Sequence, residues 1–136
     1  MRQKAILITE ECQLTTLLAP PTPHVASRAF LRLAERLKLT TREQATLLGV
    51  APRTVARIRA SEATTWDRNE LERLSHLVNI WEQAATFFGT TAGGVEWLTN
   101  LNVDFGDRRP LDVMLGGQVA DLLEVRRYLE MALQGF

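Results

Sequence analysis

The chain has 136 residues, of which 46% are hydrophobic, and its 16 basic residues balance its 16 acidic ones. This length allows one domain or two very small ones, and the composition is typical of a soluble globular protein. The sequence excludes a membrane-spanning helix, because no apolar run approaches the roughly 18–20 residues that one needs, and the single cysteine excludes an intrachain disulfide.

The first 23 residues are predicted to be an N-terminal extension. Residues 1–18 show no clean period and fit either a short helix or a strand, whereas Pro20, Pro21 and Pro23 form a stiff spacer. The start lacks the long apolar stretch of a signal peptide, so we expect a cytoplasmic protein. The two histidines lie far apart in the sequence, so we expect no metal site and no cofactor.

The net charge of zero conceals two segments of opposite charge. Residues 24–60 carry eight basic and two acidic residues, which gives +6. Residues 61–136 carry six basic and twelve acidic residues, which gives −6. A basic segment of this kind is suited to an anionic partner, so the first segment points to nucleic acid.

A first helix is predicted over residues 24–38, where apolar residues recur at helical spacing. Its apolar face consists of Val25, Ala29, Phe30, Leu33, Ala34 and Leu37. Its basic residues repeat every four positions and form one ridge, which consists of Arg28, Arg32 and Arg36. Thr40 or Thr41 is expected to cap the next helix, with Glu43 in its first turn.

Residues 41–60 resemble the DNA-binding helix-turn-helix. Ala45 is the small residue at which two helices cross closely, and Gly49 takes the left-handed turn. Val55 and Ile58 pin the second helix onto the first. The spacing of these four residues therefore predicts the motif.

The second helix of this motif, residues 52–60, is the expected recognition helix for the major groove, and Pro52 suits its first turn. Arginine can bind guanine with two hydrogen bonds, and threonine can contact phosphate or a thymine methyl group. The predicted DNA-binding residues are Arg42, Arg53, Thr54, Arg57 and Arg59. An alternative is that the motif serves packing or dimerisation without DNA, and Ala51 departs from the usual Ser or Thr cap.

A long amphipathic helix is predicted from Trp66 to Gly89, beyond a short polar connection at residues 61–65. Its apolar residues are spaced by three and four, as in a helix with one continuous buried face. This face consists of Leu71, Leu74, Val78, Trp81, Ala85 and Phe88, and it is widened by Leu77, Ile80, Ala84 and Phe87. The helix is expected to be the central strut of a small bundle.

Three shorter helices are predicted after it. Thr90 or Thr91 caps one that runs to Leu98, in which close packing against a neighbour would explain the costly pair Gly93-Gly94. Pro110 starts the second, which stops at Gly116-Gly117. The third, from Gln118 to about Leu133, is expected to bury Val119, Leu122, Leu123, Leu129 and Ala132. Left-handed turns are expected at Gly89 and Gly106, and burial is expected at Trp97, Leu98, Phe105 and Leu111.

The order of residues in this second half resembles the MbcA/ParS/Xre antitoxin family, specifically its C-terminal toxin-binding domain. The matching residues are Ala84, Phe88-Gly89, Trp97-Leu98, Asn102, Phe105-Gly106, Pro110-Leu111-Asp112 and Gly135. Arg109 departs from the Ser or Thr that usually precedes the proline, and Gly93-Gly94 replaces better helix formers.

The resemblance implies an all-α antitoxin of a type II toxin–antitoxin system. Such antitoxins are dimeric, neutralise a RES-domain toxin that destroys NAD, and repress their own operon by binding operator DNA. We therefore expect three segments: an extension at residues 1–23, an Xre-like helix-turn-helix domain at 24–65, and a toxin-binding helical bundle at 66–136. No membrane contact is expected.

In this family the C-terminal segment approaches the active-site cleft of the toxin. Phe136 follows a flexible glycine, which favours docking into a partner, although it can instead fold back onto the core. Tyr128 and Leu129 lie on the preceding turns and are expected to extend an apolar surface. The predicted toxin-binding residues are Arg126, Arg127, Leu133, Gln134, Gly135 and Phe136.

A second interpretation is a stand-alone helix-turn-helix regulator whose C-terminal bundle dimerises or senses a ligand. An enzyme is not expected, because the sequence offers no nucleophile–base pair and no glycine-rich phosphate loop. The acidic residues of the second half, Glu96, Asp104, Asp107 and Asp112, are expected to be solvated or to cap helices.

Overall fold

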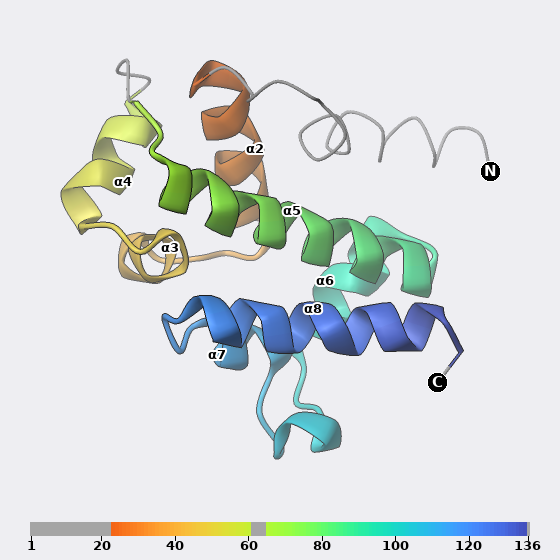
Figure 1. Ribbon diagram of the computed structural model, residues 1–136. Coiled ribbons are helices and arrows are strands. Elements are labelled where there is room, and N and C mark those ends of the chain that lie inside the picture. Colours follow the sequence, from red (N-terminus) through yellow and green to blue (C-terminus); the bar gives the residue numbers. More distant parts are fainter. Residues whose placement is uncertain (1–22, 61–64, 136) are drawn as a thin grey trace.

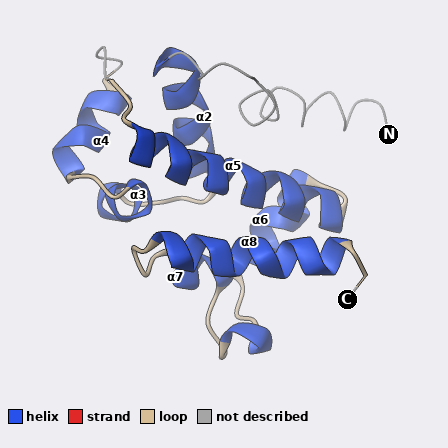
Figure 2. Cartoon of the chain, in the orientation of Figure 1, coloured by secondary structure: helices blue, strands red, loops and turns tan. Residues whose placement is uncertain are grey.

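The computed structural model describes residues 23–60 and 65–135, and all of its regular elements are helical (Figures 1 and 2). They are α2 (Pro23–Arg36), α3 (Thr41–Leu48), α4 (Pro52–Arg59), α5 (Arg68–Phe88), α6 (Thr91–Thr99), the 3₁₀ turn η1 (Val103–Phe105), α7 (Pro110–Met114) and α8 (Val119–Leu133). The predicted all-α fold is confirmed. The interpretations of residues 1–22, 61–64 and 136 lie outside the described residues, and Pro23 opens α2 rather than ending a spacer.

Helix α5 is the axis of the molecule (Figure 1). Its first half packs against α2 and α3, its last turns pack against α6, and α8 contacts it along much of its length. Helix α8 lies beside α5 and runs in the same direction, while α4 rests on α3 at the other side of the molecule. The helix-turn-helix and the C-terminal bundle are therefore built on one shared helix.

The buried apolar side chains form one continuous core that includes both halves. Its members come from α2 to α4, from α5 and from the helices that follow; the largest fully buried ones are Phe30, Leu47, Leu48, Leu77, Ile80, Leu98, Leu111, Met114, Leu122 and Leu129. Burying each of these side chains contributes roughly 1.5–3 kcal/mol. The two halves are thus held together by core packing as well as by the chain.

The expected ends of α3 and the expected start of α4 are confirmed. The Thr40 hydroxyl accepts a hydrogen bond from the Glu43 amide at 3.1 Å, and the Glu43 carboxylate accepts one from the Thr40 amide at 2.8 Å. Gly49 takes the left-handed conformation with φ of 68°. Ala51 supplies no side-chain cap to α4, as the sequence indicated, and Pro52 is the first helical residue.

The predicted start of the long helix at Trp66 is wrong by two residues. Asp67 caps α5 through a reciprocal pair of hydrogen bonds with Glu70, each 2.8 Å long. Trp66 lies before the cap, where its indole N–H donates to the Ser27 hydroxyl at 3.2 Å and its ring packs edge-on against Phe30. Trp66 therefore holds the start of α5 against α2. The helix begins at Arg68 rather than at Trp66 because Asp67 adopts the extended conformation of an N-cap residue.

The predicted burial of Phe87 and Phe88 is also wrong, because their side chains are 46% and 40% exposed. The chain turns at Gly89 into α6, which packs closely on one side of the last turns of α5. At Gly94 a β-carbon would lie 2.9 Å from the Ala85 amide nitrogen, so this glycine permits the contact. The ring of Phe88 contacts Trp97 of α6, yet both phenylalanines remain partly exposed.

Candidate functional site

Helix α4 presents basic side chains on the face opposite its buried one. Val55 and Ile58 are buried against the core, whereas Arg53 and Arg57 are exposed one turn apart and Thr54 is half-buried between the two faces. The sequence prediction of an exposed cationic helix is confirmed in its geometry. Guanidinium groups at this spacing suit the edges of neighbouring base pairs.

The other two predicted DNA-binding residues flank this helix. Arg59 is exposed and donates a hydrogen bond from Nη2 to the Thr41 hydroxyl at 3.2 Å, so it is held at the start of α3. Arg42 is exposed in the first turn of α3. The arginines of the α2 ridge are exposed as well; they are Arg28, Arg32 and Arg36. The arginines of the basic segment therefore lie on the surface of α2, α3 and α4.

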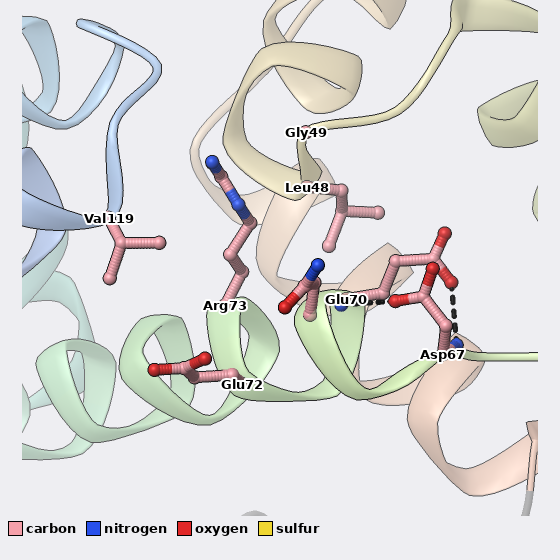
Figure 3. A pocket seen from close by; sticks show the side chains of 8 residues that line it. Leu48, Gly49, Asp67, Glu70, Glu72, Arg73 and Val119 are labelled. Atoms are coloured by element: carbon pink, nitrogen blue, oxygen red, sulfur yellow. Dashed lines mark hydrogen bonds between the residues drawn. The ribbon is translucent and has the colours of Figure 1, made fainter.

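A cavity of about 310 Å³ lies where the helix-turn-helix meets the C-terminal bundle (Figure 3). Arg73 reaches across it from α5. Its Nη2 donates to the Gly117 carbonyl at 3.1 Å, and its Nη1 donates a longer hydrogen bond to the Leu47 carbonyl at 3.4 Å. A β-carbon at Gly49 would lie 2.9 Å from this guanidinium, so the arginine packs directly on the turn of the motif.

Three polar side chains that line this cavity, Arg73, Asp67 and Glu70, are engaged in structural hydrogen bonds. Asp67 and Glu70, which also line it, form the cap of α5 (Figure 3). Among the described residues no group of three His, Cys, Asp or Glu side chains is arranged to hold a metal ion. The cavity therefore marks a joint between the two halves, with Arg73 as its bridge.

The bundle carries a row of aromatic rings that runs from the surface into the core. Phe87 and Phe88 are in edge-on contact at 4.9 Å between ring centroids, and Phe88 lies 6.1 Å from Trp97. Trp97 stacks on Tyr128 at 5.8 Å, and both rings contact Phe105. The expected burial of Phe105 and Leu98 is confirmed, whereas Trp97 is only half-buried.

Tyr128 is fixed at this row by its hydroxyl group. The hydroxyl donates a hydrogen bond of 2.6 Å to an Asp104 carboxylate oxygen. This bond favours the neutral phenol and, together with partial burial, raises the pKa of Tyr128 above its ordinary value. Asp104 belongs to η1, so the bond also ties that turn to α8.

Two more apolar side chains project from the segment between α6 and α7. Leu101 is 73% exposed and Val103 is 78% exposed. They flank Asn102, whose amide donates to the Arg108 carbonyl at 3.0 Å and whose side chain caps η1. We call Phe87, Phe88, Trp97, Leu101, Val103 and Tyr128 the apolar strip.

Arg126, a predicted toxin-binding residue, is engaged inside the bundle. Its Nε donates to Glu130 at 3.0 Å, and its Nη1 contacts His76 Nδ1 of α5 at 2.9 Å. Burial lowers the pKa of His76, and the neighbouring Arg126 cation lowers it further. A neutral His76 accepts the hydrogen bond from Arg126, which joins α8 to α5.

Of the remaining predicted toxin-binding residues, Arg127 lies midway along α8, Leu133, Gln134 and Gly135 lie at its C-terminal end, and Phe136 lies outside the described residues. Arg127, Leu133, Gln134 and Gly135 are exposed, and Gly135 adopts φ of 91°, a left-handed value that turns the backbone out of the helix. The expectation that Leu129 extends an apolar surface is wrong. Leu129 faces the core, because it lies on the side of α8 that packs against α5.

Comparison with known proteins follows the same division of the chain. A sequence model of the antitoxin Xre-like helix-turn-helix domain matches residues 22–79, and a model of the antitoxin Xre/MbcA/ParS C-terminal toxin-binding domain matches residues 83–135. The chain belongs to the Xre/MbcA/ParS antitoxin family. The two matches meet inside α5, the helix that both halves share.

Two individual proteins resemble this antitoxin. The uncharacterized protein y4oB of Sinorhizobium fredii (strain NBRC 101917 / NGR234) is 33% identical over 102 residues, which is 75% of this chain and 79% of that protein. The crystal structure of the M. tuberculosis MbcT-MbcA toxin-antitoxin complex contains a chain with the same fold, with a TM-score of 0.51 and 24% identity, over 81% of this chain and 96% of that one.

The antitoxin therefore belongs to a toxin–antitoxin system, and its C-terminal domain binds a toxin. Among the helices at residues 23–60 and 65–135, none combines the length and the apolar character of a membrane span. Exposed large hydrophobic residues of the described part all lie in the segment that matches the toxin-binding domain; they are Phe87, Phe88, Leu101, Val103, Met131 and Leu133.

Several residues that carry the family resemblance form turns or helix caps in this antitoxin. Gly89 and Gly106 adopt left-handed turns, as expected. Asp112 accepts hydrogen bonds from the amide and the guanidinium of Arg109, at distances of 2.6–3.1 Å, and so caps α7. The guanidinium of Arg109 holds the pKa of Asp112 below its ordinary value. Arg109 thus pairs with the cap of α7 where the family usually has Ser or Thr.

Sequence reasoning missed Leu101 and Val103 as surface residues. One signal was present, because both are apolar residues placed beside asparagines in a short connection between helices. An apolar side chain in such a segment either enters the core or remains for a partner. The helical period does not extend into this segment, so it cannot decide between the two.

Proposed function

We propose that this antitoxin binds and neutralises a RES-domain toxin that degrades NAD, and that it represses its own operon by binding operator DNA. One observation carries the proposal. An exposed cationic helix, α4, and a toxin-binding domain share one continuous hydrophobic core. On this proposal the chain acts by binding, without a cofactor and without catalysis of its own.

The toxin side of the proposal places the contact at the end of α8. Gly135 turns the backbone away from the helix, and the exposed Leu133 lies just before it. The residues proposed to contact the toxin are Arg126, Arg127, Leu133, Gln134, Gly135 and Phe136. MbcA, whose fold this chain shares, was crystallised with the toxin MbcT, which supports a toxin as the partner.

The test is a titration of toxin activity. The product of the gene adjacent to this one, the proposed RES-domain toxin, is purified, and its NAD consumption is measured with increasing antitoxin. We expect complete inhibition by the full chain and weaker inhibition after deletion of residues 134–136, with the melting temperature and promoter binding nearly unchanged. A deletion variant that melts early, yet inhibits fully once folded, would place these residues in the core and contradict this contact.

The DNA side of the proposal requires a homodimer. One recognition helix reads only a few base pairs, so useful affinity needs two half-sites about one helical turn apart. Arg53, Thr54 and Arg57 are proposed to face the major groove, where the two arginines read bases, and Arg42 and Arg59 are proposed to contact the phosphate backbone. The exposure of all four arginines supports their access to DNA.

Promoter binding tests this half separately. Arg53→Ala and Arg57→Ala should each weaken binding to the chain's own promoter by about 1–3 kcal/mol if they contact bases. Arg68→Ala, an exposed arginine in the first turn of α5, serves as the control. If both variants bind the promoter fragment as tightly as the wild type, the helix-turn-helix is a packing unit.

The proposed division of labour follows the segments expected from the sequence. Residues 24–65 are proposed to serve DNA binding and residues 66–136 toxin binding, with residues 1–23 as an extension. Operator DNA and an NAD-consuming toxin are both cytoplasmic, so we propose that the antitoxin acts there and without membrane contact.

A further inference from the structure

We infer that the apolar strip is a docking surface for the folded body of the toxin, separate from the proposed contact at the end of α8. This inference rests on the proposed function and names the surface that the partner covers. The strip contains four of the six exposed large hydrophobic side chains of the described residues, namely Phe87, Phe88, Leu101 and Val103. Exposed apolar surface of this kind marks an interaction site.

The strip is held rigid before any partner arrives. Its rings are in contact from Phe87 through Phe88 and Trp97 to Tyr128. The segment that carries Leu101 and Val103 is closed by the antiparallel bridge between Asn102 and Arg108, and the Tyr128 hydroxyl fixes it to α8 through Asp104. A fixed apolar surface loses little conformational entropy on binding, so it suits a tight contact.

The location of the strip identifies its occupant. Every member lies within residues 83–135, the segment that matches the toxin-binding domain. Tyr128 lies on α8, and the same helix leads through the exposed Met131 to Leu133 and the proposed C-terminal contact. A toxin bound at the end of α8 is therefore adjacent to a surface that extends from Tyr128 to α6 and the end of α5.

Charge argues against two other possible occupants of the strip, nucleic acid and a second copy of this chain. Within residues 83–135, which carry the strip, exposed acidic residues outnumber the exposed basic ones; they are Glu96, Asp104, Asp107 and Glu124 against Arg108 and Arg127. This acidic surplus repels nucleic acid. In a two-fold dimer through the strip, both copies present the same acidic surplus to each other, so the surface does not complement its own charge. The matching partner has an apolar surface with a basic rim.

The test introduces charge at the two most exposed positions of the strip. The double variant Leu101→Glu, Val103→Glu is compared with a matched control, Asn69→Glu, Ala120→Glu, which adds the same two charges at exposed sites in the first turns of α5 and α8. Binding to the product of the adjacent gene, the proposed RES-domain toxin, is measured by calorimetry, with melting temperature and oligomeric state recorded for each variant.

We expect the strip variant to bind the toxin about 100-fold more weakly, a loss typical of a buried apolar anchor, while it folds and oligomerises as the wild type does. The control should bind within about threefold of the wild type. Two results overturn the inference: toxin affinity within threefold for the strip variant, or loss of self-association with unchanged toxin binding, which assigns the strip to a second copy of this chain. A wild-type chain that binds no RES-domain protein overturns the proposed function itself.

Discussion

At the scale of single residues, Tyr128 shows how one hydrogen bond fixes the position of a ring within a row of aromatic side chains. It is the only tyrosine of the chain, and its ring touches Trp97 and Phe105 while its hydroxyl bonds Asp104. Ring contacts alone leave such a side chain free to shift along its neighbours. The hydrogen bond to a carboxylate fixes it, because a charge-assisted bond is both stronger and more directional.

Because Tyr128 is the only tyrosine, its ionisation can be followed by absorbance. The bond to the Asp104 carboxylate stabilises the neutral phenol, so the titration midpoint should lie above the ordinary value of about 10. Asp104→Asn removes the negative charge and should lower the midpoint toward that value. Asp107→Asn, an exposed acid in the same segment, is the control. Equal midpoints in the wild type and in Asp104→Asn would show that the bond does not form in solution.

At the scale of elements, local signals in the sequence predict the helices well. Thr40 with Glu43 marks the start of α3, and the apolar period marks the length of α5. The sequence does not show where a neighbouring element stops covering a helix. Phe87 and Phe88 continue the buried period of α5, yet they are exposed because the packing of α6 on the last turns of α5, through Gly94 and Trp97, covers them only in part.

The contact between α5 and α6 depends on a glycine inside a helix. A β-carbon at Gly94 would lie 2.9 Å from the Ala85 nitrogen and 3.0 Å from the Ala84 carbonyl carbon, and backbone atoms cannot move aside as a side chain can. We therefore expect Gly94→Ala to lower the free energy of unfolding by about 1–3 kcal/mol, although alanine is the better helix former. Urea unfolding measures this difference.

Ala92→Ser is the matched control, because it also adds one heavy atom in α6 but at an exposed position. It should change the free energy of unfolding by no more than about 0.5 kcal/mol. A Gly94→Ala variant as stable as the wild type would mean that α6 lies farther from α5 than described here.

At the scale of the whole molecule, the recognition surface and the toxin-binding domain are predicted by different kinds of signal. The spacing of Ala45, Gly49, Val55 and Ile58 specifies the turn, so the exposure of Arg53 and Arg57 follows from the sequence. The apolar strip cannot be predicted from the spacing of residues in the sequence. It combines the end of α5, α6, the η1 segment and α8, and only the fold brings Trp97 onto Tyr128.

The joint between the halves depends on Arg73, which no sequence pattern singles out. It donates to carbonyls of Leu47 and Gly117, one on each side of the cavity. Arg73→Met should lower the free energy of unfolding by about 1–2 kcal/mol, because both carbonyls lose a charged donor. Arg68→Met, on an exposed turn of the same helix, should have little effect in the same urea titration. Equal effects of the two substitutions would show that the bridge adds nothing to stability.

The central claim is that one antitoxin serves two partners through separate surfaces. The most direct measurement is the titration of NAD consumption by the RES-domain protein with the wild-type chain and with the Arg53→Ala, Arg57→Ala double variant. We predict that both chains inhibit the toxin completely at the same molar ratio, while only the wild type binds the promoter fragment. Undiminished NAD consumption in the presence of excess wild-type chain would contradict the account.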